Sequence, residues 1–243
     1  MPYRRLPNTD ISRLNALKTA FQKGKEIPPF KLAFTQSTFQ RVQSFLPSFE
    51  KAMIEQKQAY NAQIEKNQEY MNAYKKAKLY ISHFIQVMNM AITRNEISPS
   101  IRKFYGIEED QKKVPDLNTE NEIIQWGENI IQGEQIRTMK GQSPITNPTI
   151  AVVKVRYENF MDAYRFQKTL QKRNTRALNA LAELRDEADD IIVKIWNEVE
   201  EAFKDMPEEL KRENAQKYGL VYVFRKNELS KTDLIQSDKL QFN

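Results

Sequence analysis

Two long stretches of this chain contain neither glycine nor proline, and they constrain its fold more than any other feature. They are residues 48–98 and 149–206. Apolar residues recur along both stretches at intervals of three, four or seven, which is the spacing of one face of a helix. Because no helix breaker interrupts either stretch, the sequence predicts an all-α fold, a helical bundle of long coiled-coil-like helices.

The sequence does not decide whether residues 37–95 and 149–206 each form one long helix or a helix hairpin. A polar gap at residues 167–175 interrupts the apolar stripe of the second stretch, and helices beyond about thirty residues are uncommon. The missing breakers and the unbroken phase of the first stripe favour single helices. Pro47 predicts a kink or a restart in the first stretch, because proline removes a helical hydrogen bond.

The order of elements repeats along the chain. The triplet Asn8-Thr9-Asp10 recurs as Asn118-Thr119-Glu120, and both triplets are typical of a helix N-terminus. Gly24 and Gly133 follow at similar distances, and we expect each to end its helix. A shift of 111 residues then aligns the apolar positions of the long stretches, with Phe49 on Phe160 among them.

We therefore predict a tandem duplication of a unit of roughly 110 residues. Repeat 1 covers residues 1–113 and repeat 2 covers residues 114–226, followed by a polar C-terminal tail at 227–243. The net charge of +6 is divided unevenly between them. Repeat 1 has 19 basic and 10 acidic residues, and the rest of the chain has 19 basic and 22 acidic residues. Attraction between a basic and an acidic repeat can act within one chain or between chains.

Two short segments have the composition of strands rather than helices. Residues 220–224 are β-branched and aromatic, and residues 30–34 alternate apolar and polar side chains. The sequence predicts that they form one small strand pair beside the helices.

The chain has no cysteine and a single histidine. This composition excludes disulfides and thiolate chemistry and nearly all zinc and copper sites, so we expect no cofactor. His83 lies among apolar residues without a cysteine or carboxylate within a helical turn, and we interpret it as a buried histidine with one hydrogen-bond partner. No catalytic residue and no metal ligand is predicted.

An acidic cluster occupies one stretch of repeat 2. We interpret it as a solvated helix face, or as a face that pairs with the basic run at residues 168–176. Trp126 and Trp196 are predicted to anchor the core or an interface. The members of the cluster are Glu183, Asp186, Glu187, Asp189 and Asp190.

Residues 133–148 form the least helical part of the chain. Gly133 and Gly141 flank Arg137 and Lys140 close to the start of a predicted helix. Backbone N–H groups and basic side chains can receive an anion at such a place. These four residues are our candidate site for an anion or a partner, although a plain connecting loop explains the same pattern.

The leading hypothesis is a non-enzymatic helical interaction or structural protein that binds a protein partner or itself. The first alternative is a nucleic-acid-binding protein that uses the basic residues of repeat 1, such as Lys75, Lys76 and Lys78. The second is a small anionic ligand in the 133–148 loop. The longest uncharged run, 79–93, is too short to span a membrane, and the N-terminal residues do not read as a secretory signal. We expect a bacterial-type cytoplasmic protein.

Overall fold

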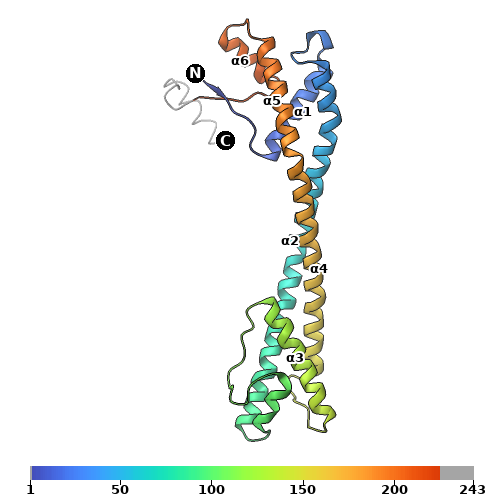
Figure 1. The fold of residues 1–243 in the computed structure, drawn as a ribbon, viewed down its shortest axis with the longest axis vertical. Coiled ribbons are helices and arrows are strands. Elements are labelled where there is room, and N and C mark those ends of the chain that lie inside the picture. Colours follow the sequence, from blue (N-terminus) through green and yellow to red (C-terminus); the bar gives the residue numbers. More distant parts are fainter. Residues whose placement is uncertain (1, 225–243) are drawn as a thin grey trace. The chain divides into compact units, whose positions relative to one another are not determined.

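The computed structural model describes residues 2–224, and helices make up most of them (Figure 1). The all-α prediction is confirmed. In chain order the elements are β1 (Tyr3–Arg4), α1 (Asp10–Glu26), η1 (Pro29–Lys31), α2 (Gln36–Thr93), η2 (Pro99–Tyr105), α3 (Glu120–Met139), α4 (Ile150–Glu183), α5 (Arg185–Ala202), α6 (Glu208–Gln216) and β2 (Tyr222–Val223). The elements η1 and η2 are 3-10 helices.

Each long stretch is helical over most of its length rather than folded into a hairpin. The helix α2 has 58 residues and continues through Pro47, so the predicted restart at this proline is wrong. Phe45, Leu46 and Phe49 are buried around the proline, and their packing offsets the one lost hydrogen bond. In the second stretch the helix is interrupted at Leu184 alone, between α4 and α5.

The chain divides into two compact units. Unit 1 consists of residues 1–58 and 175–243, and unit 2 of residues 59–174. Each unit therefore combines the first part of one predicted repeat with the last part of the other. The duplication itself stays a prediction, but two observations accord with it. Phe49 and Phe160 are both fully buried, and Thr9 and Thr119 both form a capping box at the start of a short helix.

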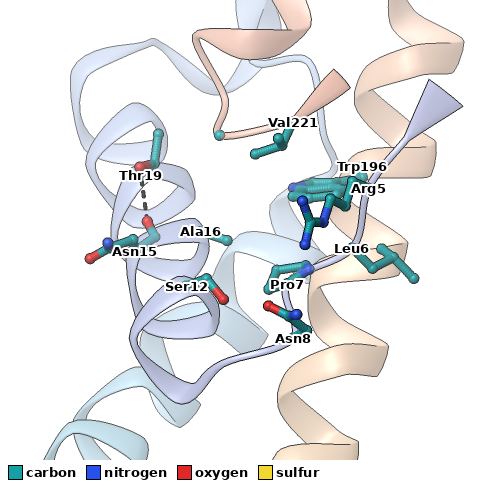
Figure 2. A pocket seen from close by; sticks show the side chains of 11 residues that line it. Arg5, Leu6, Pro7, Asn8, Ser12, Asn15, Ala16, Thr19, Trp196 and Val221 are labelled. Carbon is teal, nitrogen blue, oxygen red and sulfur yellow. Dashed lines mark hydrogen bonds between the residues drawn. The ribbon is translucent and has the colours of Figure 1, made fainter. Parts of the chain in front are cut away.

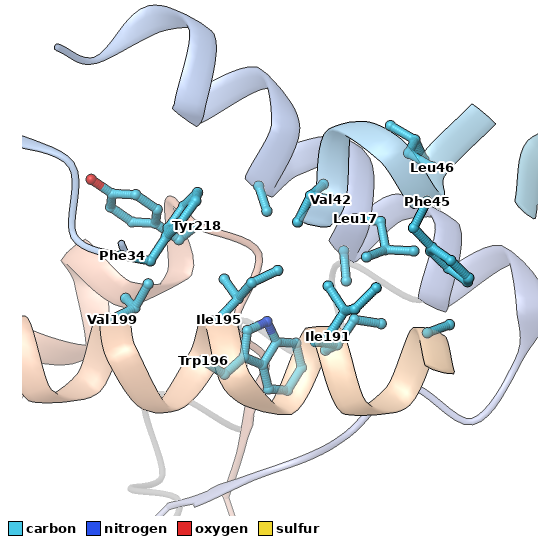
Figure 3. Packing of buried hydrophobic residues seen from close by; sticks show 14 of the residues in the cluster. Leu17, Phe34, Val42, Phe45, Leu46, Ile191, Ile195, Trp196, Val199 and Tyr218 are labelled. Atoms are coloured by element: carbon cyan, nitrogen blue, oxygen red, sulfur yellow. The ribbon is translucent and has the colours of Figure 1, made fainter. Parts of the chain in front are cut away.

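The core of unit 1 lies between α1, the first part of α2, and α5 (Figure 3). Leu17 of α1 and Val42 of α2 meet Ile191 and Ile195 of α5, and all four side chains are at most 1% exposed. Trp196 belongs to the same cluster, as predicted for a core anchor. Tyr218 and Leu220 extend the cluster toward the C-terminal strand.

The core of unit 2 is formed by the last part of α2, η2, α3 and the first part of α4. Three aromatic rings pack around Phe160, with their centroids 5.8 to 6.4 Å from that of Phe160. Gly127 of α3 lies against Tyr157 of α4, and a Cβ atom at this glycine would come within 2.3 Å of the tyrosine ring. The absence of a side chain thus lets α3 approach α4 closely. The rings around Phe160 are those of Tyr70, Tyr74 and Tyr164.

The strand pair is present but the predicted partner is wrong. β2 pairs antiparallel with β1, with Tyr3 opposite Val223 and Arg4 opposite Tyr222. Residues 29–31 form η1 instead, because Pro28 and Pro29 cannot donate to a strand ladder and start a tight turn. The predicted polar tail, residues 227–243, lies outside the described residues. Among residues 2–224, none of the helices combines the length and the apolar character that crossing a membrane requires.

Gly24 and Gly133 do not end their helices, contrary to the prediction. Gly24 lies inside α1 and Gly133 inside α3. Each permits a close approach. A Cβ atom at Gly24 would lie 2.2 Å from the ring of Phe39, and one at Gly133 would lie 2.3 Å from the carbonyl oxygen of Phe104. The repeated position of a glycine, which we interpreted as a helix stop, therefore reflects close packing in both helices.

Gly24→Ala tests this packing role. Helix propensity alone would stabilise the protein by about 1 kcal/mol. We expect instead a loss of about 1 to 3 kcal/mol in the free energy of unfolding, because the added methyl group overlaps Phe39. Urea unfolding followed by circular dichroism measures the change. Asn179→Ala, at an exposed helical position, is the control and should give a small gain; a gain for both variants would contradict the packing role.

Candidate functional site

The candidate functional site is a pocket of about 440 Å³ in unit 1 (Figure 2). Three parts of the chain line it. Residues 5–8 follow β1, one face of α1 forms a wall, and Trp196 of α5 lies beside the segment that leads to β2. The wall of α1 consists of Ser12, Asn15, Ala16 and Thr19.

The capping box at Thr9 defines the residue at which α1 begins. The Thr9 hydroxyl accepts a hydrogen bond from the Ser12 N–H, and the Ser12 hydroxyl is bonded to the Thr9 backbone. Since α1 begins at a defined residue, positions 12, 15, 16 and 19 lie on one side of the helix. The pocket wall is therefore set by local sequence.

Two ion pairs hold α1 against α5. Arg13 donates two hydrogen bonds of 2.8 Å to the carboxylate of Asp189, and Arg185 donates two of 2.8 Å to Asp10. Hydrogen bonding to Asp189 raises the pKa of Arg13, and its partial burial opposes this effect. In the predicted acidic cluster, Arg13 binds Asp189 and Arg41 lies opposite Glu187, while Glu183, Asp186 and Asp190 are exposed.

The strand pair closes another side of the pocket. The backbone N–H of Arg5 donates to the carbonyl of Val221 at 2.8 Å, which extends the pairing of β1 and β2 by one step. Gly219 has φ +89, and a Cβ atom there would lie 3.3 Å from Thr19. Glycine at this position therefore allows the C-terminal segment to turn close to α1.

Trp196 forms the floor of the pocket and is 1% exposed. Arg4 lies over its ring at 5.9 Å from the ring centroid and donates to Glu200 and Asn197. The hydroxyl of Tyr222 also donates to Glu200; burial and this bond raise the pKa of Tyr222. Arg4 is therefore held by internal partners, and the tryptophan ring is fixed between it and the core.

Arg5 differs from Arg4 in having no ion-pair partner among residues 2–224. Its side chain lines the same pocket as Trp196 (Figure 2). The side-chain amides of Asn8 and Asn15 also line the pocket, and no hydrogen bond engages them within the described part of the chain. The pocket thus presents one cation and two amide groups above an apolar floor of Trp196, Ala16 and Val221.

This pocket suits binding better than proton transfer. Arg5 is its one ionisable lining side chain, and a guanidinium stays charged at all physiological pH values. The Ser12 hydroxyl is committed to the capping box and has no base beside it. Within residues 2–224, no group of three or more histidine or carboxylate side chains is arranged to hold a metal ion.

The residues predicted to bind an anion occupy a different place, in unit 2, and do not form a cradle. Gly133 and Arg137 lie inside α3, which continues to Met139. Lys140 lies over the ring of Phe104 at 4.9 Å, and Gly141 forms a turn with φ +80. Arg137 is 1% exposed and is bound by Glu134, which is fully buried. The predicted site therefore lacks an accessible arginine.

Glu134 and Arg137 belong to a buried polar network with Tyr105. Arg137 donates hydrogen bonds of 2.8 Å to both Glu134 oxygens and one of 2.7 Å to the carbonyl of Ser143. The Tyr105 hydroxyl and the N–H of Ile145 also donate to Glu134. Burial opposes ionisation of Glu134, but these hydrogen bonds outweigh it and lower the pKa of the carboxyl. The network fixes the loop after α3 onto η2 and α3.

No family model matches the chain, and neither a curated protein nor a solved structure matches it at a significant level. The geometry of the chain itself therefore carries the functional argument.

Arg137→Met tests the network. It leaves Glu134 buried without its cation, so we expect a loss of about 3 to 5 kcal/mol in the free energy of unfolding at pH 7. Chemical denaturation measures it. Arg94→Met removes an exposed arginine paired with Glu96 and should have little effect on the free energy of unfolding, because solvent screens the pair. Equal effects would show that burial of the Glu134 pair contributes nothing.

The network also predicts a pH dependence. The pKa of Glu134 is lower in the folded protein, so its stabilising contribution is present above the unfolded pKa of about 4.3 and is lost as the pH falls through the folded pKa. The free energy of unfolding should therefore fall less steeply below about pH 5 in Glu134→Gln than in the wild type. Unfolding curves between pH 3 and pH 7 measure both slopes, and parallel curves would contradict the assignment.

Proposed function

We propose that the chain is a non-enzymatic interaction protein and that the pocket of unit 1 binds an acidic segment of a protein partner. The observation that carries the proposal is the Arg5 guanidinium, which has no ion-pair partner within residues 2–224 and lines the same pocket as Trp196. An arginine at the edge of an apolar pocket is suited to a carboxylate, which it can bind through two parallel hydrogen bonds.

The other lining groups favour a peptide as the ligand. The amides of Asn8 and Asn15 each offer a donor and an acceptor, which is the complement of a backbone peptide group. The apolar floor can contact an aliphatic side chain next to the acidic residue. The pocket volume of about 440 Å³ lies in the range of small-ligand sites. A segment with a carboxylate and a neighbouring leucine or isoleucine would satisfy all three features.

The two alternative functions have less support. Arg4 and Arg13, basic residues of repeat 1, are held by Glu200 and Asp189 and are not available to phosphates. Lys78 donates to Asn118, which leaves Lys75 and Lys76 exposed. An anion in the loop after α3 would have to be held by Lys140 and Gly141 without Arg137.

Tryptophan fluorescence tests the proposal in a Trp126→Phe background, where Trp196 is the one remaining tryptophan. The probes are synthetic blocked hexapeptides with Asp or Glu beside Leu or Ile, each with a matched Asn or Gln version. We expect the acidic peptides to shift Trp196 emission with micromolar to millimolar affinity, and the amide versions to bind at least about tenfold more weakly, since a charged hydrogen-bonded pair contributes about 1.5 to 3 kcal/mol.

Arg5→Gln should abolish the preference for acidic peptides while leaving the fold intact, because Arg5 is exposed. Arg94→Gln, at an exposed arginine of unit 2, is the matched control and should bind as the parent does. The proposal fails if no acidic peptide shifts the emission, or if Arg5→Gln retains the full preference.

A further inference from the structure

The outward face of α4 in unit 2 has the spacing of a helix-packing surface but is not covered by residues 2–224. Val152, Val155 and Phe166 are 40%, 52% and 51% exposed. They follow intervals of three and eleven residues, which place them within one stripe of the helix. The opposite face of α4 carries the buried residues Val153, Tyr157 and Phe160, which pack in the core of unit 2.

A groove of about 420 Å³ adjoins this stripe between α4 and α2. Leu79, Tyr80 and His83 of α2 line one side, and Pro148 and Val152 line the other. His83 is exposed here, so the predicted buried histidine is wrong. Two residues after Ile81 on a helix, its side chain points away from the core side that Ile81 occupies.

Two charged residues beside the stripe lack an ion pair within the described residues. Arg156 lies over the ring of Tyr80, 5.4 Å from its centroid, and its buried Nε atom has no hydrogen-bond partner there. Asp162 is exposed and has no basic side chain within ion-pair distance among residues 2–224. The two lie six residues apart on α4, too far along the helix to pair with each other.

The residues of the stripe are arranged symmetrically about Asn159. Arg156 precedes it by three residues and Asp162 follows it by three; Val152 precedes it by seven and Phe166 follows it by seven. In two antiparallel copies of one helix that cross at Asn159, residues equidistant from the crossing point lie opposite each other. Arg156 of each copy then meets Asp162 of the other, and Val152 meets Phe166.

We propose that this surface binds a second copy of the chain, with the two α4 helices antiparallel and the two-fold axis at Asn159. Phe166 of the second copy enters the groove beside Val152 and Leu79, and the reciprocal contact occurs at the other end. The two Asn159 amides pair at the axis, as a polar residue in a helical seam fixes its register. Such an isologous contact forms the pair between Arg156 and Asp162 twice, once in each direction.

A second copy explains the surface better than an unrelated helix does. Any apolar helix could cover Val152, Val155 and Phe166. The second copy also supplies an acid for Arg156, a base for Asp162 and an aromatic side chain for the groove, all in one register. The surface shares no residue with the pocket of unit 1, so this inference and the peptide-binding proposal can fail independently.

Sedimentation equilibrium of the full chain tests the inference by charge reversal. The wild type should dimerise, and Arg156→Glu or Asp162→Arg alone should raise the dimer dissociation constant at least about tenfold, because each places like charges opposite each other. The double variant Arg156→Glu with Asp162→Arg should return it to within about tenfold of the wild type. A monomeric wild type, or a double variant as weak as the single ones, would overturn the inference.

Phe166→Glu tests the apolar contact in the same measurement. It should raise the dissociation constant at least about 100-fold, since a charge replaces a central aromatic side chain at both ends of the interface. Met139→Glu, at a 74% exposed position on α3, is the matched control and should leave the constant unchanged. Circular dichroism confirms that both variants are folded. An unchanged dimer in Phe166→Glu would place the interface elsewhere and sink the proposal.

Cysteine crosslinking tests the position of the axis. The natural chain has no cysteine, so Asn159→Cys introduces a single thiol. If the axis passes through this residue, mild oxidation should convert most of the variant to a disulfide-linked dimer. Gln125→Cys, at an exposed position of α3, should give little dimer under the same conditions. Equal crosslinking of the two variants would contradict the proposed register.

Discussion

The contact between α1 and α5 positions the wall of the pocket in unit 1. Arg13 with Asp189 and Arg185 with Asp10 form two bidentate ion pairs that connect residues about 175 positions apart in the chain. Farther along both helices, Leu17 and Ile191 belong to the same buried core. The ion pairs fix the register of α1 along α5, and the burial of Ala16, Leu17 and Ala20 fixes the face of α1 that meets the core. Ser12, Asn15 and Thr19 face the Trp196 floor as a consequence of both.

The helical class and most core positions could be predicted because helix periodicity is a local property. The intervals of three, four and seven residues identified Phe49, Ile81, Phe160 and Ile192, and all four are buried. The partners of the strands could not be predicted in this way. β1 is two residues long and pairs with a segment more than 200 residues later, so no local pattern distinguishes it from a loop. The helix restart predicted at Pro47 was wrong for a related reason, since the packing that offsets the missing hydrogen bond comes from segments distant in the chain.

The pocket of unit 1 was missed because its lining comes from both ends of the chain. One local signal was available: Ser12, Asn15 and Thr19 are polar residues at helical spacing beside the apolar face of α1. An equally local signal bears on the predicted anion site. Glu134 precedes Arg137 by three residues, and this spacing places an acid next to a base within one helix. An arginine with such a neighbour is a poor candidate for an external anion.

Five arginines of the described residues occupy two kinds of environment, which differ in the partner of each guanidinium. Arg4, Arg13 and Arg137 are bound by carboxylates from other turns or helices, so their charges are used to hold the fold. Arg5 lines the pocket that contains Trp196, Arg156 lies over the ring of Tyr80, and neither has an ion-pair partner within residues 2–224. A guanidinium held by a ring keeps its five N–H donors for other acceptors. The positions of these two arginines, one in each unit, are the reason to expect an acidic ligand at both.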